Sequence, residues 1–126
     1  MKQLLAANIP DLRERNIDIY LTVVIAFVIG LATLTPVEKL TVVSGSDKLY
    51  HLLSFAILTF TIAMVRPKAV RWILILSLIF GGAIELLQPF VNRSCEFADF
   101  LADACGATLG IMVSRVLVRA LRSRTD

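Results

Sequence analysis

The sequence has few of the residues that build most soluble binding sites. It contains one histidine and two cysteines, and only 18% of its 126 residues are Asp, Glu, Lys or Arg. No zinc-finger spacing is present, and there is no basic stripe with interleaved aromatic residues. Because the net charge is only +3, we expect no nucleic-acid partner.

The two cysteines, Cys95 and Cys105, are not expected to form a disulfide. If the intervening segment is helical, they lie roughly 15 Å apart at 1.5 Å per residue, beyond the reach of an S–S bond. We interpret Cys105, which lies among small residues, as a packing residue. Cys95 is interpreted as a loop thiol, because only Arg93 is near enough in sequence to stabilise a thiolate.

Apolar residues are abundant and form long runs. They make up 57% of the chain, the mean hydropathy is +0.78, and the charges gather at the ends of the runs. Each run is about 19 residues or more, close to the length needed to cross the hydrocarbon of a bilayer, and prolines 36, 67 and 89 follow the first three. The pattern predicts an all-α membrane protein, a four-transmembrane-helix bundle whose helices cover residues 17–35, 47–65, 70–88 and 97–118.

The flanking segments indicate the orientation of this 17–118 domain. Residues 1–16 are predicted to be an interfacial segment and not a signal peptide, because Asp11 and Glu14 interrupt the charged region. Residues 119–126 form a basic tail. With four helices, ten basic residues fall on one side of the membrane and only Lys39, Lys48 and Arg93 on the other. By the positive-inside rule, we predict an inner (cytoplasmic) membrane protein with both termini in the cytoplasm.

This topology brings polar side chains from separate segments to one depth beneath the outer face. Ionisable groups at such positions cost roughly 2.5–3.5 kcal/mol each on insertion scales, so they seldom occur without a partner or a task. The cytoplasmic halves of the segments carry almost none. We therefore predict a ligand-binding polar cluster, named by these residues throughout: Asp47, Lys48, His51, Glu85, Gln88, Arg93, Asp99 and Asp103.

Structural explanations stay open for most of these residues. Asp47 could cap the second helix and Asp99 the fourth, whereas Asp103 lies a turn too deep to be a cap. Glu85 could form an ion pair with Lys48 or Arg93, or a hydrogen bond to His51. No metal ion or other cofactor is assigned to the cluster.

The same positions resemble those of a known family. Asp47-Lys48-xx-His51-xxx-Phe55, Glu85-xx-Gln88, Arg93 and Asp99-xxx-Asp103-xx-Gly106-xxx-Gly110, in this order and spacing, resemble the VanZ-like family of small bacterial membrane proteins. That family commonly has Asn where this chain has Asp103. It is named for a protein associated with resistance to the glycopeptide antibiotic teicoplanin. The resemblance implies a four-helix inner-membrane protein linked to the cell envelope, without a known reaction.

Three functions remain open at this stage. The first is a non-enzymatic module, embedded in the lipid bilayer, that binds an amphiphile, a lipid headgroup or a lipid-linked cell-wall intermediate. The second is a membrane hydrolase or transferase, with His51, Glu85 and Asp103 as acid, base or metal ligands. No recognisable nucleophile motif supports it. The third is a purely structural network. Gly106 and Gly110 form a small-xxx-small face that fits internal packing or a homo-oligomer.

Overall fold

The structure, a computed structural model, describes residues 15–36 and 46–123. The described residues form four long α-helices and two short 3₁₀ helices, with no strand among them. The prediction of an all-helical chain is confirmed. The elements are α2 (Ile17–Thr33), α3 (Asp47–Val65), η2 (Pro67–Ala69), α4 (Val70–Leu87), η3 (Gln88–Val91) and α5 (Phe97–Arg122).

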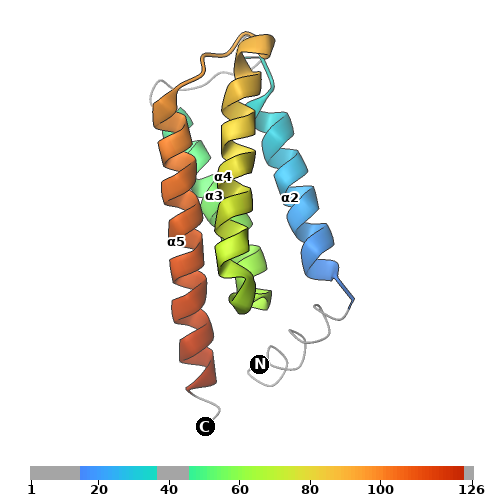
Figure 1. Cartoon of the computed structure of the whole chain (residues 1–126), viewed down its shortest axis with the longest axis vertical. Helices are drawn as coiled ribbons and strands as arrows, with labels where there is room; N and C mark the ends of the chain where they lie inside the picture. The colour runs from blue at the N-terminus through green and yellow to red at the C-terminus, as the bar shows by residue number, and fades with distance from the viewer. Residues whose placement is uncertain (1–14, 37–45, 124–126) are drawn as a thin grey trace.

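The four helices run side by side and alternate in direction (Figure 1). The start of α2, the turn between α3 and α4, and the end of α5 therefore lie at one end of the bundle, which we call the basic end. Its described cations are Arg15, Arg66, Lys68, Arg71, Arg115, Arg119 and Arg122. The start of α3, the end of α4 and the start of α5 lie at the opposite end, which we call the polar end.

Three helical segments are long and apolar enough to cross a membrane, namely Asp47–Val65, Pro67–Val91 and Phe97–Arg122. Helix α2 is apolar but has 17 residues, about 25 Å at 1.5 Å per residue. Large apolar side chains cover the outside of all four helices, as on Val23, Leu76 and Val116. A surface this apolar needs lipid or protein around it. The fold is that of a membrane protein, and a crossing by α2 stays a prediction.

Helices α3 and α5 form the tightest seam in the bundle, and two glycines of α5 make it possible. A Cβ atom on Gly106 would overlap the Leu52 carbonyl oxygen, and one on Gly110 would overlap the Ala56 carbonyl oxygen. Thr59 also donates a hydrogen bond across the seam to the Ala107 carbonyl at 2.9 Å. Gly106 and Gly110 are therefore used for packing within the chain, and a homo-oligomer stays a prediction.

Helix α2 is held at its basic end by an ion pair. Arg66, just after α3, donates to the buried Asp18 carboxylate and also reaches the Asn16 side chain at 3.1 Å. Along the rest of α2, only Ile29 is buried. Helix α2 is thus the most lightly packed of the four helices.

Several details of the sequence analysis are corrected by the structure. Asp47 is the first residue of α3 and binds Arg93, so it is not the cap. Helix α5 continues to Arg122, four residues beyond the predicted end, so the tail predicted from Arg119 begins as helix. Arginine is a good helix former, and it is favoured near a helix C-terminus by the helix dipole. Cys105 is exposed and free like Cys95, so it is not a core packing residue.

Candidate functional site

Five polar side chains of the polar end are buried inside the bundle. They come from α3, α4, η3 and α5, and none is more than 4% exposed: His51, Glu85, Gln88, Asp99 and Asp103. Segments separated by more than 30 residues are thereby brought to one layer. The structure brings these five side chains together, whereas their depth in a membrane and a role in ligand binding stay predictions.

His51 and Asp103 form the centre of this layer. The His51 Nδ1 atom lies 2.9 Å from Asp103 Oδ1, and both side chains are almost fully buried. His51 lies four residues before the buried Phe55 in α3 and therefore shares its helix face. Because that face packs inward, His51 points into the bundle. Asp103 lies on the seam face of α5, one turn before Gly106. A carboxylate at Nδ1 orients the ring and leaves Nε2 for other chemistry.

Glu85 is held by the turn between α4 and α5. The backbone N–H of Glu96 donates to Glu85 Oε2 at 3.1 Å. With its amide oriented to donate, Gln88 reaches the Ser94 carbonyl at 2.9 Å and Glu85 Oε2 at 3.3 Å. The ion pair of Glu85 with Lys48 or Arg93 that the sequence left open is not formed. One oxygen of Glu85 is therefore fixed by the turn, and the other is free.

The two cations of the cluster are already paired with acids. Arg93, whose side chain is only 7% exposed, donates to both Asp47 oxygens at 3.0 and 3.1 Å. Asn92 adopts a left-handed conformation, φ 58°, that turns the chain between η3 and Arg93. Lys48 lies 2.9 Å from Glu96 and 3.4 Å from Asp99. These pairs close the layer at the polar end.

Glu96 was not predicted as a site residue, although it contacts Lys48, Ser94 and Glu85. It accepts from Lys48, and Ser94 Oγ donates to it at 3.1 Å. The hydrogen bond from Lys48 lowers the pKa of the Glu96 carboxyl below its ordinary value of 4.5. The only sequence signal was an acid immediately before α5, where a negative charge favours a helix N-terminus.

Four buried polar atoms of this layer have no hydrogen-bond partner among the described residues. Of the four, Asp99 Oδ1 still forms an ion pair, because the Lys48 ammonium lies 3.4 Å away. Within the described ranges, the other three atoms form no ion pair either, and such groups are costly in a dry environment. The four are His51 Nε2, Glu85 Oε1, Asp99 Oδ1 and Asp103 Oδ2.

A glycine of α4 leaves room for one of these atoms. A Cβ on Gly81 would lie 2.8 Å from Asp103 Oδ2 and 3.2 Å from the Asp103 Cβ. The neighbouring Gly82 would meet nothing closer than the Phe100 ring at 3.8 Å. Gly81 therefore lets α4 approach the Asp103 carboxylate, and an alanine at that position would displace it.

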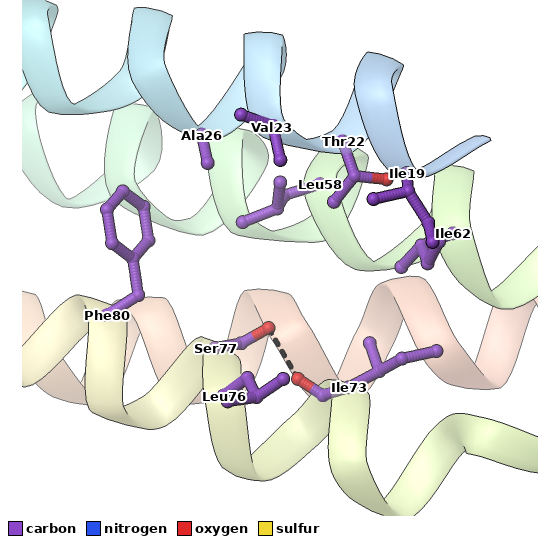
Figure 2. A pocket seen from close by; sticks show the side chains of 10 residues that line it. All are labelled: Ile19, Thr22, Val23, Ala26, Leu58, Ile62, Ile73, Leu76, Ser77 and Phe80. Atoms are coloured by element: carbon purple, nitrogen blue, oxygen red, sulfur yellow. Dashed lines mark hydrogen bonds between the residues drawn. The ribbon is translucent and has the colours of Figure 1, made fainter. Parts of the chain in front are cut away.

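A separate apolar groove of about 380 Å³ lies between α2 and α4, over α3 (Figure 2). Its few polar groups are satisfied locally, since Ser77 donates to the Ile73 carbonyl at 2.8 Å. Phe80 lines its end nearest the polar cluster and stacks on the buried Phe55, with 5.7 Å between ring centroids. The groove suits hydrocarbon and holds no candidate chemistry, so the polar cluster is the better functional site.

The fold and the site together define a small helical membrane protein with a buried polar centre at one end of its bundle. Comparison with protein families matches residues 13–118 to the VanZ/LLP1 family, which covers most of the chain. The protein therefore belongs to the VanZ/LLP1 family, as its motifs suggested. No curated protein and no solved structure gives a match.

Proposed function

We propose that this protein binds the polar headgroup of an amphiphile at the polar end of its bundle, without converting it. The observation that supports this function is the set of buried, unpartnered atoms on His51, Glu85 and Asp103. A membrane protein that retains such groups needs something to satisfy them. A lipid is the ligand that reaches this depth most readily.

The pairing within the cluster favours a headgroup that carries hydrogen-bond donors. Arg93 and Lys48 are engaged by acids, so they are poorly placed to bind a phosphate. The free atoms on Glu85 and Asp103 are acceptors, and they would receive bonds from an ammonium or hydroxyl group. We therefore propose an amine- or hydroxyl-bearing lipid or lipid-linked cell-envelope intermediate. A link to teicoplanin resistance, as the family name suggests, fits such a ligand.

The proposal places the polar end at the outer face of the inner membrane, with four crossings and both chain ends in the cytoplasm. In support, most of the described cations lie at the basic end, whereas Lys48 and Arg93 are the described cations of the polar end. Basic residues favour the cytoplasmic side.

Thermal unfolding of the purified full chain in detergent tests the proposed function. Phosphatidylethanolamine is the probe, and phosphatidylcholine, which has the same phosphate but no N–H donor, is its comparison. Since a ligand that binds only the native state stabilises it, we expect phosphatidylethanolamine to raise the unfolding midpoint and phosphatidylcholine to leave it unchanged. Glu85→Gln should abolish the rise. Glu96→Gln, a change at an exposed acid of the same turn, should keep it.

Equal responses to the two lipids, or an undiminished response in the Glu85→Gln variant, would contradict headgroup recognition by this cluster. A panel of hydroxyl-rich lipids such as phosphatidylglycerol, measured in the same way, separates amine from hydroxyl recognition.

A hydrolase or transferase is the second candidate, because the His51–Asp103 geometry leaves Nε2 available as a general base. Ser94 is exposed and bonded to Glu96, so water would have to be the attacking group. Turnover of a headgroup-labelled lipid by the wild-type chain, lost in His51→Ala, would favour this candidate over simple binding.

A further inference from the structure

We propose that His51, Glu85 and Asp103 bind one divalent transition-metal ion, with Zn²⁺ as the best-fitting species. One donor atom from each of the three lies within 4.8 Å of the others, and all three side chains are buried. The inference deepens the proposed function and rests on the same site, since the ion would contact the oxygen of a hydroxyl-bearing headgroup.

The unpartnered atoms are the first argument for an ion at this point. Glu85 Oε1 and Asp103 Oδ2 lack a hydrogen-bond partner in the described part of the chain, and His51 Nδ1 lies 2.9 Å from Asp103 Oδ1. Each is a usual zinc ligand, with Zn–N near 2.0–2.1 Å and Zn–O near 2.0–2.2 Å. Two ligands of one ion lie at most about 4.4 Å apart, a separation that His51 Nδ1 and Asp103 Oδ1 already meet.

The charges of the layer are the second argument. Arg93 neutralises Asp47, and Lys48 lies between Glu96 and Asp99. Among the described residues, these pairs leave the Glu85 and Asp103 carboxylates without a cation other than His51. A divalent ion with a neutral imidazole would balance both carboxylates, which removes the cost of buried net charge.

The donor set decides the class of metal. Mg²⁺ and Ca²⁺ prefer ligand sets made of oxygen atoms, whereas an imidazole nitrogen favours Zn²⁺ and related transition ions. At His51 Nδ1, the ion would take the place of the hydrogen bond that joins this atom to Asp103 Oδ1 at 2.9 Å. Gly81 is part of the site as well, because a side chain there would push Asp103 Oδ2 away.

The test uses the full chain, purified in detergent and stripped with a chelator. Titration with Zn²⁺, followed by calorimetry and by elemental analysis, should give one ion per chain, and Mg²⁺ should not compete. Asp103→Asn keeps a hydrogen-bond acceptor for His51 but loses the charge, and Glu85→Gln loses a ligand. We expect each to weaken Zn²⁺ binding at least about tenfold, as changes around metal sites commonly do.

Matched control variants keep the proposal testable even if one variant folds poorly. Glu96→Gln is the control for the acids, and it should bind Zn²⁺ like the wild type. Gly81→Ala should weaken binding by displacing Asp103, whereas Gly82→Ala, with space for its methyl group, should not. Wild-type affinity in Glu85→Gln, Asp103→Asn and Gly81→Ala together would mean adventitious zinc only, and would overturn the inference.

Failure of this inference is distinguishable from failure of the proposed function. If the stripped chain binds no stoichiometric Zn²⁺ but is still stabilised by phosphatidylethanolamine, the metal site is refuted and headgroup binding stands. If Zn²⁺ binds as expected but no lipid changes the unfolding midpoint with or without the ion, the metal site stands and headgroup binding is refuted.

Discussion

At the scale of residues, the polar cluster divides into pairs that hold the structure and atoms that remain available. Arg93–Asp47 and Lys48–Glu96 are complete ion pairs. By contrast, Glu85 is bonded through one oxygen and not through the other. A network that served only stability would be expected to satisfy its buried atoms, because each unsatisfied one costs free energy. The presence of both paired and unpaired groups therefore favours a ligand-binding site over a purely structural network.

Asp103 has a structural role that can be separated from its charge. Asp103→Ala removes the acceptor beside His51 Nδ1 and leaves a buried donor unpaired, which should cost about 1–3 kcal/mol of stability. Asp103→Asn keeps an acceptor and should cost clearly less. Equilibrium unfolding in mixed micelles measures both, and equal stability of the two variants would show that the His51 contact contributes nothing.

The Lys48–Glu96 pair predicts a pH dependence. Because the pKa of Glu96 is lowered in the folded chain, its stabilising effect is present above pH 4.5 and is lost as the pH falls through the lower, folded-state value. The wild type should therefore unfold at a higher temperature than Glu96→Gln at pH 7, and the difference should vanish in acid. A difference that stayed constant from pH 7 to pH 3 would contradict the ion pair.

At the scale of elements, the seam between α3 and α5 sets the position of His51 against Asp103. The two helices approach closely because Gly106 and Gly110 lack side chains, and van der Waals packing is the main force between helices in lipid. The site therefore depends on glycines that carry no chemistry of their own. Helix α2 contributes little to it, because α2 is fastened mainly at its basic end.

Gly106→Ala tests the seam. Its Cβ would overlap the Leu52 carbonyl, so the helices must separate, and we expect a loss of at least about 1–3 kcal/mol. Gly30→Ala is the matched control, because nothing lies within 4 Å of its added Cβ. That change should be neutral, or stabilising by about 0.4–1 kcal/mol. Thermal unfolding of both variants in one detergent measures this difference. Similar losses of stability in the two variants would rule out a tight seam.

At the scale of the whole molecule, the arrangement of helices followed from simple sequence features. Runs of membrane-crossing length, ended by Pro67 and Pro89, predicted α3 and α4 to within a residue. Alternating helix directions then placed His51, Glu85 and Asp103 in one layer. Their distances follow from close packing, which the sequence indicated only through its glycines.

The ion pairs and hydrogen bonds of the polar cluster could not be predicted from these sequence features. Which acid meets Arg93 depends on how the turn after η3 folds back over the start of α3, and local pattern carries no information on that. The same turn gives Glu96 its contacts. The groove beside α2 was also missed, because it forms where α2 and α4 fail to close over α3.

The native cysteines allow the orientation to be measured. Cys95 is exposed in the turn at the polar end, and Cys105 is exposed on α5, which is long and apolar enough to cross a membrane. In a Cys105→Ala variant, a membrane-impermeant maleimide added to spheroplasts should label Cys95 without lysis. A Cys95→Ala variant is the control and should stay unlabelled, since Cys105 faces hydrocarbon. Labelling of Cys95 only after lysis would reverse the proposed topology.

The most direct test of the central claim is the stability of ligand-free Glu85→Gln against ligand-free wild type. Sites kept for a ligand are commonly a cost to the fold. Removing the unpaired charge while keeping the acceptor for the Glu96 N–H should leave the chain at least as stable, or more stable by about 0.5–2 kcal/mol. A loss of more than about 1 kcal/mol, typical of a broken structural contact, would show that the cluster serves the fold instead.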